Sequence, residues 1–560
     1  MKIVNQLINF KSKNKIFFLP LGGAGEIGMN LNMYCYQNEW LIVDCGVTFK
    51  DHEAIGADVF MPNIDVIVQN SLNIKGLLIT HAHEDHIGAV HHLWPFLKCP
   101  IYLTPFSAYL LKQRLIDAGL NEQVKLNVVK KESKFNIGKF NLELINMSHS
   151  TLEPNSVLIT MGKERIFHTG DWKIDKNPTV GNETNTKRLK EIGKEGIRAI
   201  VCDSTNANVN GYSGSEKSVE NGIAKYIKNF KGRIFITMFA SNLERMLAIM
   251  RLASLYKREV GLIGRSMWRM CDAARNVGYL NTSVKISSEK FLRNIKDEKF
   301  LSICTGSQGE PLGALNRIID ENHPHINFKN GDRIIFSSRK IPGNEVSIGN
   351  LMNKLIDKGI EIILPQENNI HVSGHPARDE LKLMYSWIKP EISIPVHGEA
   401  LQIKAHAELA ENSGVKNVLK IKNGHLVEFS NKQVKIVEKV DSGKLALNGD
   451  ELIPTNSLLF KERKRMLFNG VVSINLIIGE TGDTIELPRI KFLAVLFELK
   501  EKELFEFSSF LNEQIKGFIP IKRSKEQLLK DHLKKKAKRY LLNNFEKNPS
   551  IILDIIYIAD

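Results

Sequence analysis

The segment His81-Ala82-His83-Glu84-Asp85-His86 places three imidazoles and two further carboxylates within six positions. It follows Ile74–Thr80, an apolar run typical of a β-strand, so the cluster is expected at a strand end. Imidazole and carboxylate are ligands that a borderline-soft divalent metal such as zinc prefers, and a strand does not need them for packing. His81 and His83 can reach one metal, while Asp85 and His86 face a second. The segment therefore predicts a hydrolytic metal site rather than a polar loop that is merely rich in histidine.

Short apolar runs separated by turns surround this cluster. A helix is expected from Ile87 to Trp94, ended by Pro95, which places the cluster between a strand and a helix. Strands are predicted at 15–21, 31–36, 40–44, 74–80, 100–103, 125–130, 141–147, 156–161 and 165–168.

The chain has 560 residues, more than one hydrophobic core normally serves, so several domains are expected. From 206 to 359 the pattern is regularly α/β, with helices at 223–230 and 242–255 and strands at 233–237 and 259–263. The predicted domains are 1–205, 206–359, 360–440 (the second part of the first domain, with strands at 360–364 and 392–396), a linker at 441–455, and a C-terminal domain at 456–560.

A basic helix is predicted at 522–540, with nine Lys or Arg residues against two acids. It could contact RNA, support oligomerisation or be a solvated helix, and we rank the last first. The whole chain carries a formal net charge of +15, which favours a polyanionic partner, with nucleic acid ahead of an anionic membrane. Lys outnumbers Arg, so a Lys-rich proteome is an alternative origin of this charge.

The six cysteines are scattered without a C-x-x-C pair, and most lie beside apolar residues. They are interpreted as small buried thiols, which indicates a reducing compartment. No apolar run approaches the length of a membrane-spanning helix. We therefore expect a cytoplasmic protein that does not bind a membrane.

The motif Gly23-Ala24-Gly25-Glu26-Ile27-Gly28 follows a strand and fits the dinucleotide fingerprint G-x-G-x-x-G. That fingerprint requires a helix to begin at the glycines. The residues that follow, Asn30–Tyr36, alternate as a strand does. A tight turn beside the active site is therefore favoured over nucleotide binding.

Two further candidate ligands stand at strand ends. His149 follows the run Leu142–Met147, and Asp171 follows Phe167-His168-Thr169-Gly170. Each alone would be interpreted as a turn or cap residue. With the first cluster they form a dinuclear set, in which Asp171 could bridge.

The order Asp44, then H-x-H-x-D-H, then His149, then Asp171 resembles the metallo-β-lactamase superfamily. Later segments resemble its β-CASP nucleic-acid-processing branch, with Asp203, His375 and His397 matching that branch's three later motifs. The resemblance is closest to the bacterial ribonuclease J family and covers roughly residues 15–480. Its specific segments are 22–28, Phe239–Asn242, Thr305–Pro311, His371–His375 and Pro395–Glu399.

This resemblance implies an α/β fold, a metallo-β-lactamase αββα sandwich split by an inserted β-CASP domain, plus a small C-terminal α/β domain. It also implies two Zn²⁺ ions, with Mn²⁺ or Mg²⁺ possible in activity. One zinc would bind His81, His83 and His149. The second would bind Asp85, His86 and His397, with Asp171 bridging. Asp44 would orient a liganding imidazole, Asp85 would also serve catalysis, and His375 would be the general acid, oriented by Asp203. A metal ligand or a structural turn residue is the alternative for His375.

The substrate pocket implied by the resemblance lies in two places. The turn His371-Val372-Ser373-Gly374-His375 could form a phosphate-binding nest. Ala240, Ser241 and Asn242 precede the helix 242–255 and could bind another phosphate, although helix capping is the plain alternative for Ser241 and Asn242. The expected partner is single-stranded RNA with a 5′-monophosphate.

The expected activity is a two-metal ribonuclease with 5′-to-3′ exonuclease and endonuclease action in RNA maturation and decay, in a homodimer or higher oligomer. The alternatives are a DNA-processing nuclease of the same fold, a non-catalytic RNA-binding subunit, which would lack metal ligands, and a small-molecule hydrolase, which the 206–359 insertion disfavours.

Overall fold

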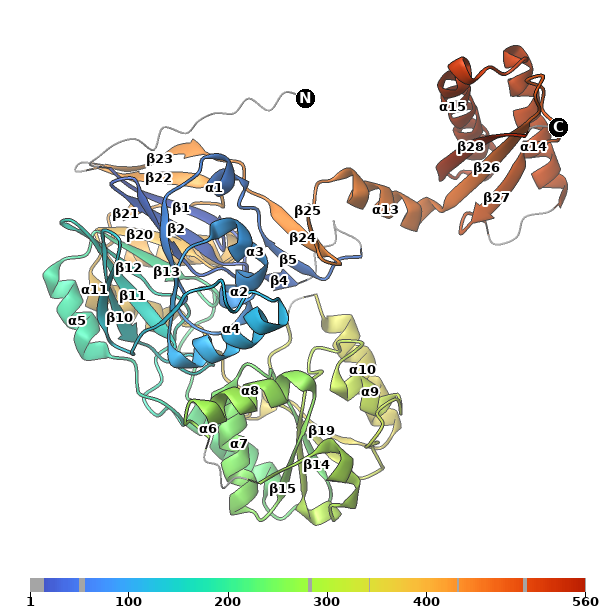
Figure 1. Cartoon of the computed structure of the whole chain (residues 1–560). Helices are drawn as coiled ribbons and strands as arrows, with labels where there is room; N and C mark the ends of the chain where they lie inside the picture. Colours follow the sequence, from blue (N-terminus) through green and yellow to red (C-terminus); the bar gives the residue numbers. More distant parts are fainter. Residues whose placement is uncertain are drawn as a thin grey trace. The chain divides into compact units, whose positions relative to one another are not determined.

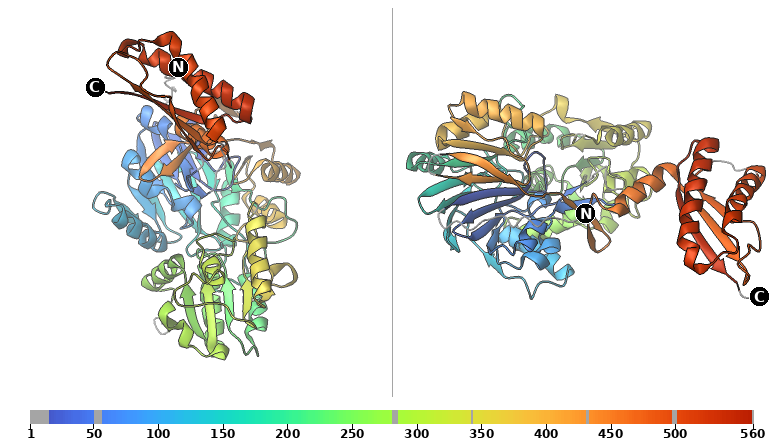
Figure 2. Two further views of the ribbon diagram at one scale, coloured as in Figure 1. Left: turned by 90° about the vertical axis from the view of Figure 1, so that its right-hand side faces the viewer. Right: turned by 90° about the horizontal axis from the view of Figure 1, so that it is seen from above.

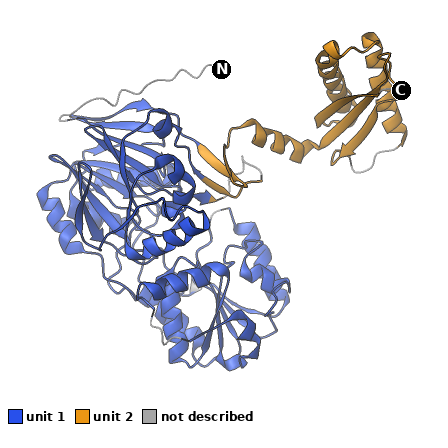
Figure 3. Cartoon of the chain, in the orientation of Figure 1, with its two compact units in different colours: residues 1–48, 61–443 blue, residues 49–60, 444–560 orange. Residues whose placement is uncertain are grey.

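The computed structural model describes residues 15–49, 56–280, 285–341, 343–430, 433–496 and 501–558. The first fourteen residues of the predicted domain 1–205 lie outside the described residues. The chain divides into two compact units, 1–48 with 61–443, and 49–60 with 444–560 (Figure 3).

Two β-sheets face each other in the first unit and enclose a core of apolar side chains from both, including Phe18, Leu142 and Ile394. The first sheet has the order β23 (Val434–Lys439), β22 (His425–Phe429), β1 (Ile16–Gly22), β2 (Leu31–Tyr36), β3 (Glu39–Val43), β6 (Ile74–Leu78), β7 (Ile101–Leu103), β8 (Leu126–Val128). The second has the order β21 (Asn417–Val418), β20 (Ile392–Val396), β13 (Ala199–Asp203), β12 (Glu164–His168), β11 (Asn155–Met161), β10 (Phe140–Asn146), β9 (Lys134–Ile137).

Helices cover the outer faces of this sandwich (Figures 1 and 2). Leu189, Leu381 and Leu409 pack from three helices onto the outer face of the second sheet. These helices are α5 (Thr186–Glu195), α11 (Arg378–Ile388) and α12 (Ala400–Asn412). Along the first sheet run α1 (Asp65–Gln69), α2 (Glu84–Ile87), α3 (Val90–Leu97) and α4 (Pro105–Asp117). The predicted αββα sandwich is confirmed.

The helix after the histidine cluster differs from the prediction. The expected single helix Ile87–Trp94 is two helices, α2 and α3, and Pro95 lies inside α3 instead of ending it. Pro95 removes one backbone hydrogen bond, but Leu93, Trp94 and Leu97 are buried, and this packing holds the last turn. The helix ends at Leu97, and the next residue, Lys98, has a left-handed backbone with φ 44°.

The insertion forms a six-stranded, fully parallel sheet. Its order is β16 (Ile286–Ser287), β15 (Glu259–Ile263), β17 (Phe300–Cys304), β14 (Ile234–Thr237), β18 (Arg333–Phe336), β19 (Glu361–Ile363). Strand β19 pairs with β18, so the sheet extends to residue 363. One face is covered by α6 (Glu216–Ile227), α7 (Leu243–Leu255) and α8 (Arg265–Asn276), and the other by α9 (Ala314–Ile319) and α10 (Glu345–Asp357).

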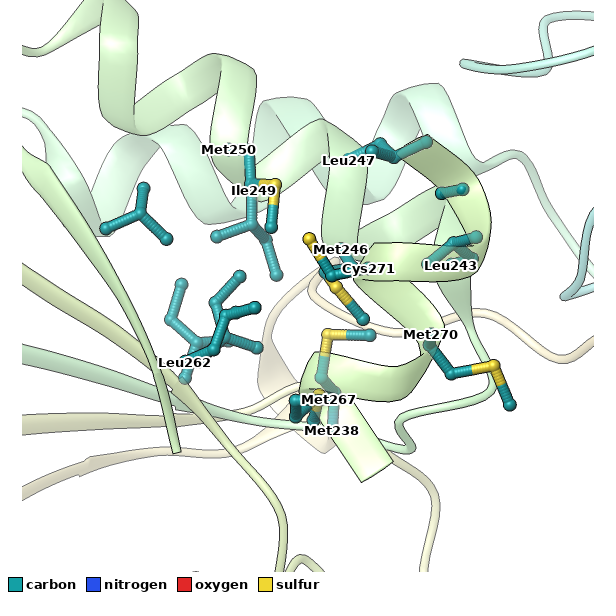
Figure 4. Packing of buried hydrophobic residues seen from close by; sticks show 14 of the residues in the cluster. Met238, Leu243, Met246, Leu247, Ile249, Met250, Leu262, Met267, Met270 and Cys271 are labelled. Atoms are coloured by element: carbon teal, nitrogen blue, oxygen red, sulfur yellow. The ribbon is translucent and has the colours of Figure 1, made fainter. Parts of the chain in front are cut away.

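Sulfur-containing side chains fill the space between α7, α8 and this sheet. Met238, Met246, Met267 and Cys271 lie together there in Figure 4. Unbranched thioether side chains fill irregular gaps, which suits the junction of two helices with a twisted sheet. Short 3-10 helices, η1 (Glu289–Asn294), η2 (Asp297–Lys299) and η3 (Pro365–Glu367), complete the connections.

The second unit contains two small sheets. Residues 441–455, predicted as a linker, include the hairpin β24 (Lys444–Asn448) and β25 (Glu451–Pro454), which forms because Ala446 packs against Phe60 and Phe460. β4 (Thr48–Phe49) and β5 (Val59–Pro62) complete that sheet, and α13 (Leu458–Asn469) follows. The other sheet has the order β27 (Arg489–Leu493), β26 (Val471–Ile478), β28 (Ser550–Tyr557), and packs with α14 (Glu501–Ile515) and α15 (Glu526–Phe545), while η4 (Lys516–Phe518) and η5 (Arg523–Lys525) join the helices.

The predicted basic helix 522–540 corresponds to α15, which begins at Glu526 and ends at Phe545. The helix, ranked first as a solvated helix, is exposed to solvent on part of its surface only. Leu529, Leu533, Ala537 and Leu541 recur every four residues and are buried against the sheet, so the basic residues occupy the remaining faces.

Two smaller predictions are confirmed. The strand-type alternation after Gly28 forms β2, which is antiparallel to β1, so no helix begins at the glycines. All six cysteines are buried and free. Across the described ranges, no helix combines the length and the hydropathy that crossing a membrane requires.

Candidate metal centre

The predicted ligands lie beyond the ends of strands in the first unit. His81 and His83 follow β6, and Asp85 and His86 lie in α2. The strands β12, β13 and β20 are parallel neighbours, so their carboxyl ends bring three more side chains to one edge of the sheet. These are Asp171, Asp203 and His397, and His149, after β10, joins them.

One group consists of His81, His83, His149 and Asp171, whose ligand atoms all lie within 4.8 Å of one another. His149 Nε2 is 3.0 Å from His83 Nδ1, and two imidazole nitrogens at that distance need a shared proton or a cation. The buried Nε2 of His81 has no hydrogen-bond partner among the described residues. Burial lowers the pKa of His83 to about 4 and that of His149 well below its ordinary value, which favours the neutral imidazole that binds metals.

A second group consists of Asp85, His86, Asp171 and His397. His397 Nε2 is 3.1 Å from Asp85 Oδ2, and His86 Nε2 is 3.3 Å from Asp171 Oδ2. Burial alone would lower the pKa of His86, but the carboxylates of Asp171, Asp85 and Asp44 raise it well above its ordinary value. A cation bound here would take the place of the protons that these carboxylates now stabilise. Asp171 belongs to both groups, as a bridging ligand must.

Asp44 holds the imidazole of His86 in place. Its Oδ2 accepts a hydrogen bond from His86 Nδ1 at 2.7 Å, which leaves His86 Nε2 turned toward the centre. It also accepts hydrogen bonds from the backbone N–H and the hydroxyl of Thr80, at 2.8 and 2.9 Å. The Thr80 hydroxyl in turn lies 3.0 Å from His81 Nδ1, so Asp44 and Thr80 together fix one imidazole of each group.

His375 lies beside the second group and contacts a different carboxylate. Its Nδ1 is 2.8 Å from Oδ2 of the fully buried Asp203, while 22% of the His375 side chain is exposed. Burial would lower the pKa of His375, but Asp203 and Asp171 raise it above its ordinary value, as a proton donor requires. Asp171, Asp203, His375 and His397 also lie within ligand distance of one another, so the alternative of His375 as a metal ligand stays open.

The turn 371–375 is held from three sides. Arg245 Nη1 lies 2.7 Å from His371 Nδ1, and Arg245 Nη2 donates to the Val372 carbonyl at 3.2 Å. Ser373 Oγ accepts from the Asn206 amide at 2.8 Å. Gly374 accepts from His149 Nδ1 at 2.6 Å, and a Cβ at Gly374 would lie 2.8 Å from the His149 ring, so this approach requires glycine.

The residues at the start of α7 divide between two roles. The side chain of Asn242 accepts from the Arg245 N–H at 3.1 Å, which is helix capping. Ala240 and Ser241 are half-buried just before the helix. Within the described part of the chain, the capping side chain of α7 is that of Asn242 and not that of Ser241.

Sequence reasoning missed the residues that orient the others. Thr80 contacts both Asp44 and His81. Its position between an apolar strand and a candidate ligand could have indicated this role from the sequence. Thr205 donates to Asp203 Oδ1 at 2.7 Å and lies 3.0 Å from His397 Nδ1. Arg245 is buried in an ion pair with Glu216, at 2.6 Å, and its helical position gave no such signal.

Comparisons with known proteins agree with this geometry. Residues 39–185 match the beta-lactamase superfamily domain, 231–355 the beta-CASP domain of ribonuclease J, and 359–419 the Zn-dependent metallo-hydrolase RNA specificity domain. A solved structure from Enterococcus faecalis V583, titled a protein of unknown function, has a TM-score of 0.55 at 14% identity over 74% of this chain and 100% of its own, a similarity of fold alone.

Curated relatives cover most of the chain. Ribonuclease J of Sinorhizobium meliloti is 40% identical over 480 residues, which is 85% of each protein. Ribonuclease J of Synechocystis is 31% identical over 549 residues, 96% of this chain and 86% of the relative. Ribonuclease J2 of Bacillus subtilis is 30% identical over 467 residues, 83% of this chain and 84% of the relative. With its metallo-β-lactamase sandwich, its inserted β-CASP sheet and these relatives, the chain belongs to the ribonuclease J family.

Proposed function

We propose that this chain is a metal-dependent ribonuclease that hydrolyses phosphodiester bonds with two zinc ions. His81, His83 and His149 would hold one ion, Asp85, His86 and His397 the other, and Asp171 would lie between them. The observation that carries this proposal is the membership of Asp171 in both ligand groups. The buried, unpartnered His81 Nε2 supports it, and the family membership favours RNA over DNA as substrate and an enzyme over a non-catalytic subunit.

Two divalent cations bound there would lower the pKa of a water and offset charge on the phosphoryl oxygens. The protein's own part is orientation and proton transfer. Asp44 and Thr80 hold His86 and His81. Because Asp203 occupies Nδ1 of His375, Nε2 is the atom that would protonate the leaving 3′-oxygen.

The substrate is proposed to be single-stranded RNA with a 5′-monophosphate, degraded from its 5′-end and sometimes cut internally. Among the described residues, the N–H groups of Val372, Ser373 and Gly374 donate to no acceptor, which supports a phosphate site in this turn. Ser241 would add a hydroxyl. Six free cysteines support a cytoplasmic location, and a homodimer or higher oligomer and activity with Mn²⁺ or Mg²⁺ are part of the same proposal.

Matched strands with different 5′-ends test this function. Single-stranded RNA with a 5′-monophosphate should be degraded to mononucleotides faster than the same RNA with a 5′-triphosphate or hydroxyl, and DNA of equal sequence should be slowest. Ser241→Ala should reduce the difference in degradation rate between RNAs with different 5′-ends. Ser254→Ala, an exposed serine at the other end of α7, is the matched control and should keep it. Equal rates on all 5′-ends, or faster cutting of DNA, would contradict the 5′-exoribonuclease.

A further inference from the structure

The topology of the inserted parallel sheet leaves a crevice between two neighbouring strands, away from the metal centre. Strands β15 and β17 are neighbours, yet the helices that follow them cover opposite faces. Met267 of α8 packs on one face, and Leu315 of α9 packs on the other. In open parallel sheets, ligands bind outside the carboxyl ends of strands where the connections diverge in this way.

A cavity of about 630 Å³ lies at this place. Ligand pockets in proteins range from roughly 300 to 1,000 Å³, so a nucleotide-sized ligand fits. The lining comes from the end of β15, the first turns of α8 and α9, the residue after β17, and Glu289, Leu312 and His323. It shares no residue with the metal centre. Thr305 opens the segment Thr305–Pro311, a family motif to which the metal centre gives no role.

The charge of this cavity is strongly positive. Arg265, Arg269 and Arg317 line it, and among the described residues none of the three forms an ion pair. Arg265 begins α8, where the helix dipole disfavours a cation unless an anion lies nearby. The lining carboxylate, Glu289, is already engaged by the Gly264 N–H at 3.2 Å and by His323 Nε2 at 3.5 Å.

The backbone is built closely around the crevice. Gly264 has φ +115°, and a Cβ there would lie 2.7 Å from Thr305 Oγ1, so the turn into α8 approaches the loop after β17 as only glycine permits. Met267, Met270 and Cys271 fix the inner face of α8 (Figure 4). Arg265 and Arg269 are left exposed on the cavity side of the helix.

We propose that this cavity is a second binding site, distinct from the metal centre, for the phosphate of a nucleotide. The three guanidinium groups would bind phosphate oxygens. The phosphate can come from a free mononucleotide or from a phosphodiester of the RNA strand. The inference rests on the proposed ribonuclease function only for the choice of these two phosphate sources.

Calorimetric titration of the metal-loaded full chain with AMP tests the site. The wild type should bind two AMP per chain, one at each site. Replacing Arg265, Arg269 and Arg317 together by Gln should weaken one of the two sites by at least about tenfold, because charge-assisted hydrogen bonds are lost. Lys228→Ala is the charge control, because Lys228 is exposed beyond the end of α6, on the side where β14 begins, and does not line the cavity. It should leave both sites intact.

Kinetics separate the two sources of phosphate. If the RNA strand supplies it, the triple variant should raise KM for a strand of about twenty nucleotides and leave KM for one of about four unchanged. If a mononucleotide supplies it, AMP stoichiometry falls while both KM values stay. One AMP per chain in wild type and variant with unchanged KM values, or equal effects of Lys228→Ala, would overturn the proposal. The failure of the ribonuclease function would instead appear as absent cleavage by the wild type.

Discussion

At the scale of single residues, the candidate metal centre depends on side chains that orient the proposed ligands. Asp44 accepts hydrogen bonds from His86 and from two groups of Thr80, and it does so with a left-handed backbone, φ 65°. A non-glycine residue in this conformation costs of order 1 kcal/mol or more and persists only where its surroundings fix it. The backbone at Asp44 is therefore set by what its carboxylate must reach.

Asp44→Asn should weaken metal binding by about 10–100-fold while the fold is kept. The amide preserves the shape but loses the charge that stabilises the His86 N–H, and one of its two atoms cannot accept a hydrogen bond. Competition with a chelating dye measures the affinity. Asp65→Asn, at an exposed position of α1, is the control, and equal affinities of the two variants would contradict the role of Asp44.

His375→Ala separates a proton donor from a metal ligand. The variant should retain two metal ions per chain and bind RNA, while kcat falls by about 10²–10⁴. Elemental analysis and single-turnover cleavage give the two values. Loss of an ion would show that His375 is a ligand, as its distance from Asp171 and His397 also permits.

The sequence indicated the candidate ligands better than it indicated the residues that hold them in place. His81, Asp171 and His397 follow predicted strands, and a histidine or aspartate directly after an apolar run can be recognised in the sequence alone. Arg245 looks like any helical arginine, and its contacts with Glu216 and Val372 depend on segments far apart in the chain. The fold class followed from the motifs, whereas the hairpin at 444–454 did not, because its partner Phe60 lies almost four hundred residues earlier.

At the scale of elements, α7 joins the inserted sheet to the sandwich through buried charge. Arg245 pairs with Glu216 and donates to Ser337 and Val372. The adjacent Glu244 accepts hydrogen bonds from the Thr179 hydroxyl at 3.0 Å and the Val180 N–H at 3.3 Å. Burial, followed by repulsion from Glu216, raises the pKa of Glu244 to about 7.

This shift predicts how stability depends on pH. The folded state holds a proton on Glu244 up to about pH 7, whereas the unfolded chain releases it near pH 4.5. The contribution of Glu244 to stability is therefore fully present below about pH 4.5 and declines until about pH 7, by a few kcal/mol at most.

Glu244→Gln should remove this decline, so the difference in Tm between variant and wild type should grow in the variant's favour from pH 5 to pH 8. Thermal unfolding across that range measures this difference. The control variant is Glu220→Gln, because Glu220 pairs with the half-exposed Arg251. A difference in Tm that is independent of pH would exclude the raised pKa.

At the scale of the whole molecule, the two compact units have separate cores. The core of the C-terminal sheet contains Leu533, Phe507 and Val472, and no residue of the metal centre. Each unit should therefore respond to its own core substitutions.

Leu533→Ala should lower the stability of the second unit by about 2–5 kcal/mol, since Leu533 is fully buried there. Calorimetry should show one unfolding transition shifted to lower temperature, with metal content unchanged. Leu528→Ala, on the exposed side of the same helix, is the control and should shift it little. Loss of metal from Leu533→Ala would show that the units are coupled.

The strand order of the sandwich determines which strands remain unpaired while the chain is being synthesised. Strand β1 pairs with β22, Ile16 opposite Phe429, and β13 pairs with β20, Ala199 opposite Ile392. Roughly 190 residues separate the end of β13 from β20, which amounts to about 10–40 s of synthesis. During that interval β1 and β13 each have one unpaired edge, and unpaired apolar edges favour aggregation of a nascent chain. The inserted sheet pairs only with itself and can fold meanwhile. The ligand group of Asp85, His86, Asp171 and His397 is complete only after translation has passed His397. A nascent chain that lacks this group should therefore not cleave the transcripts around its own ribosome.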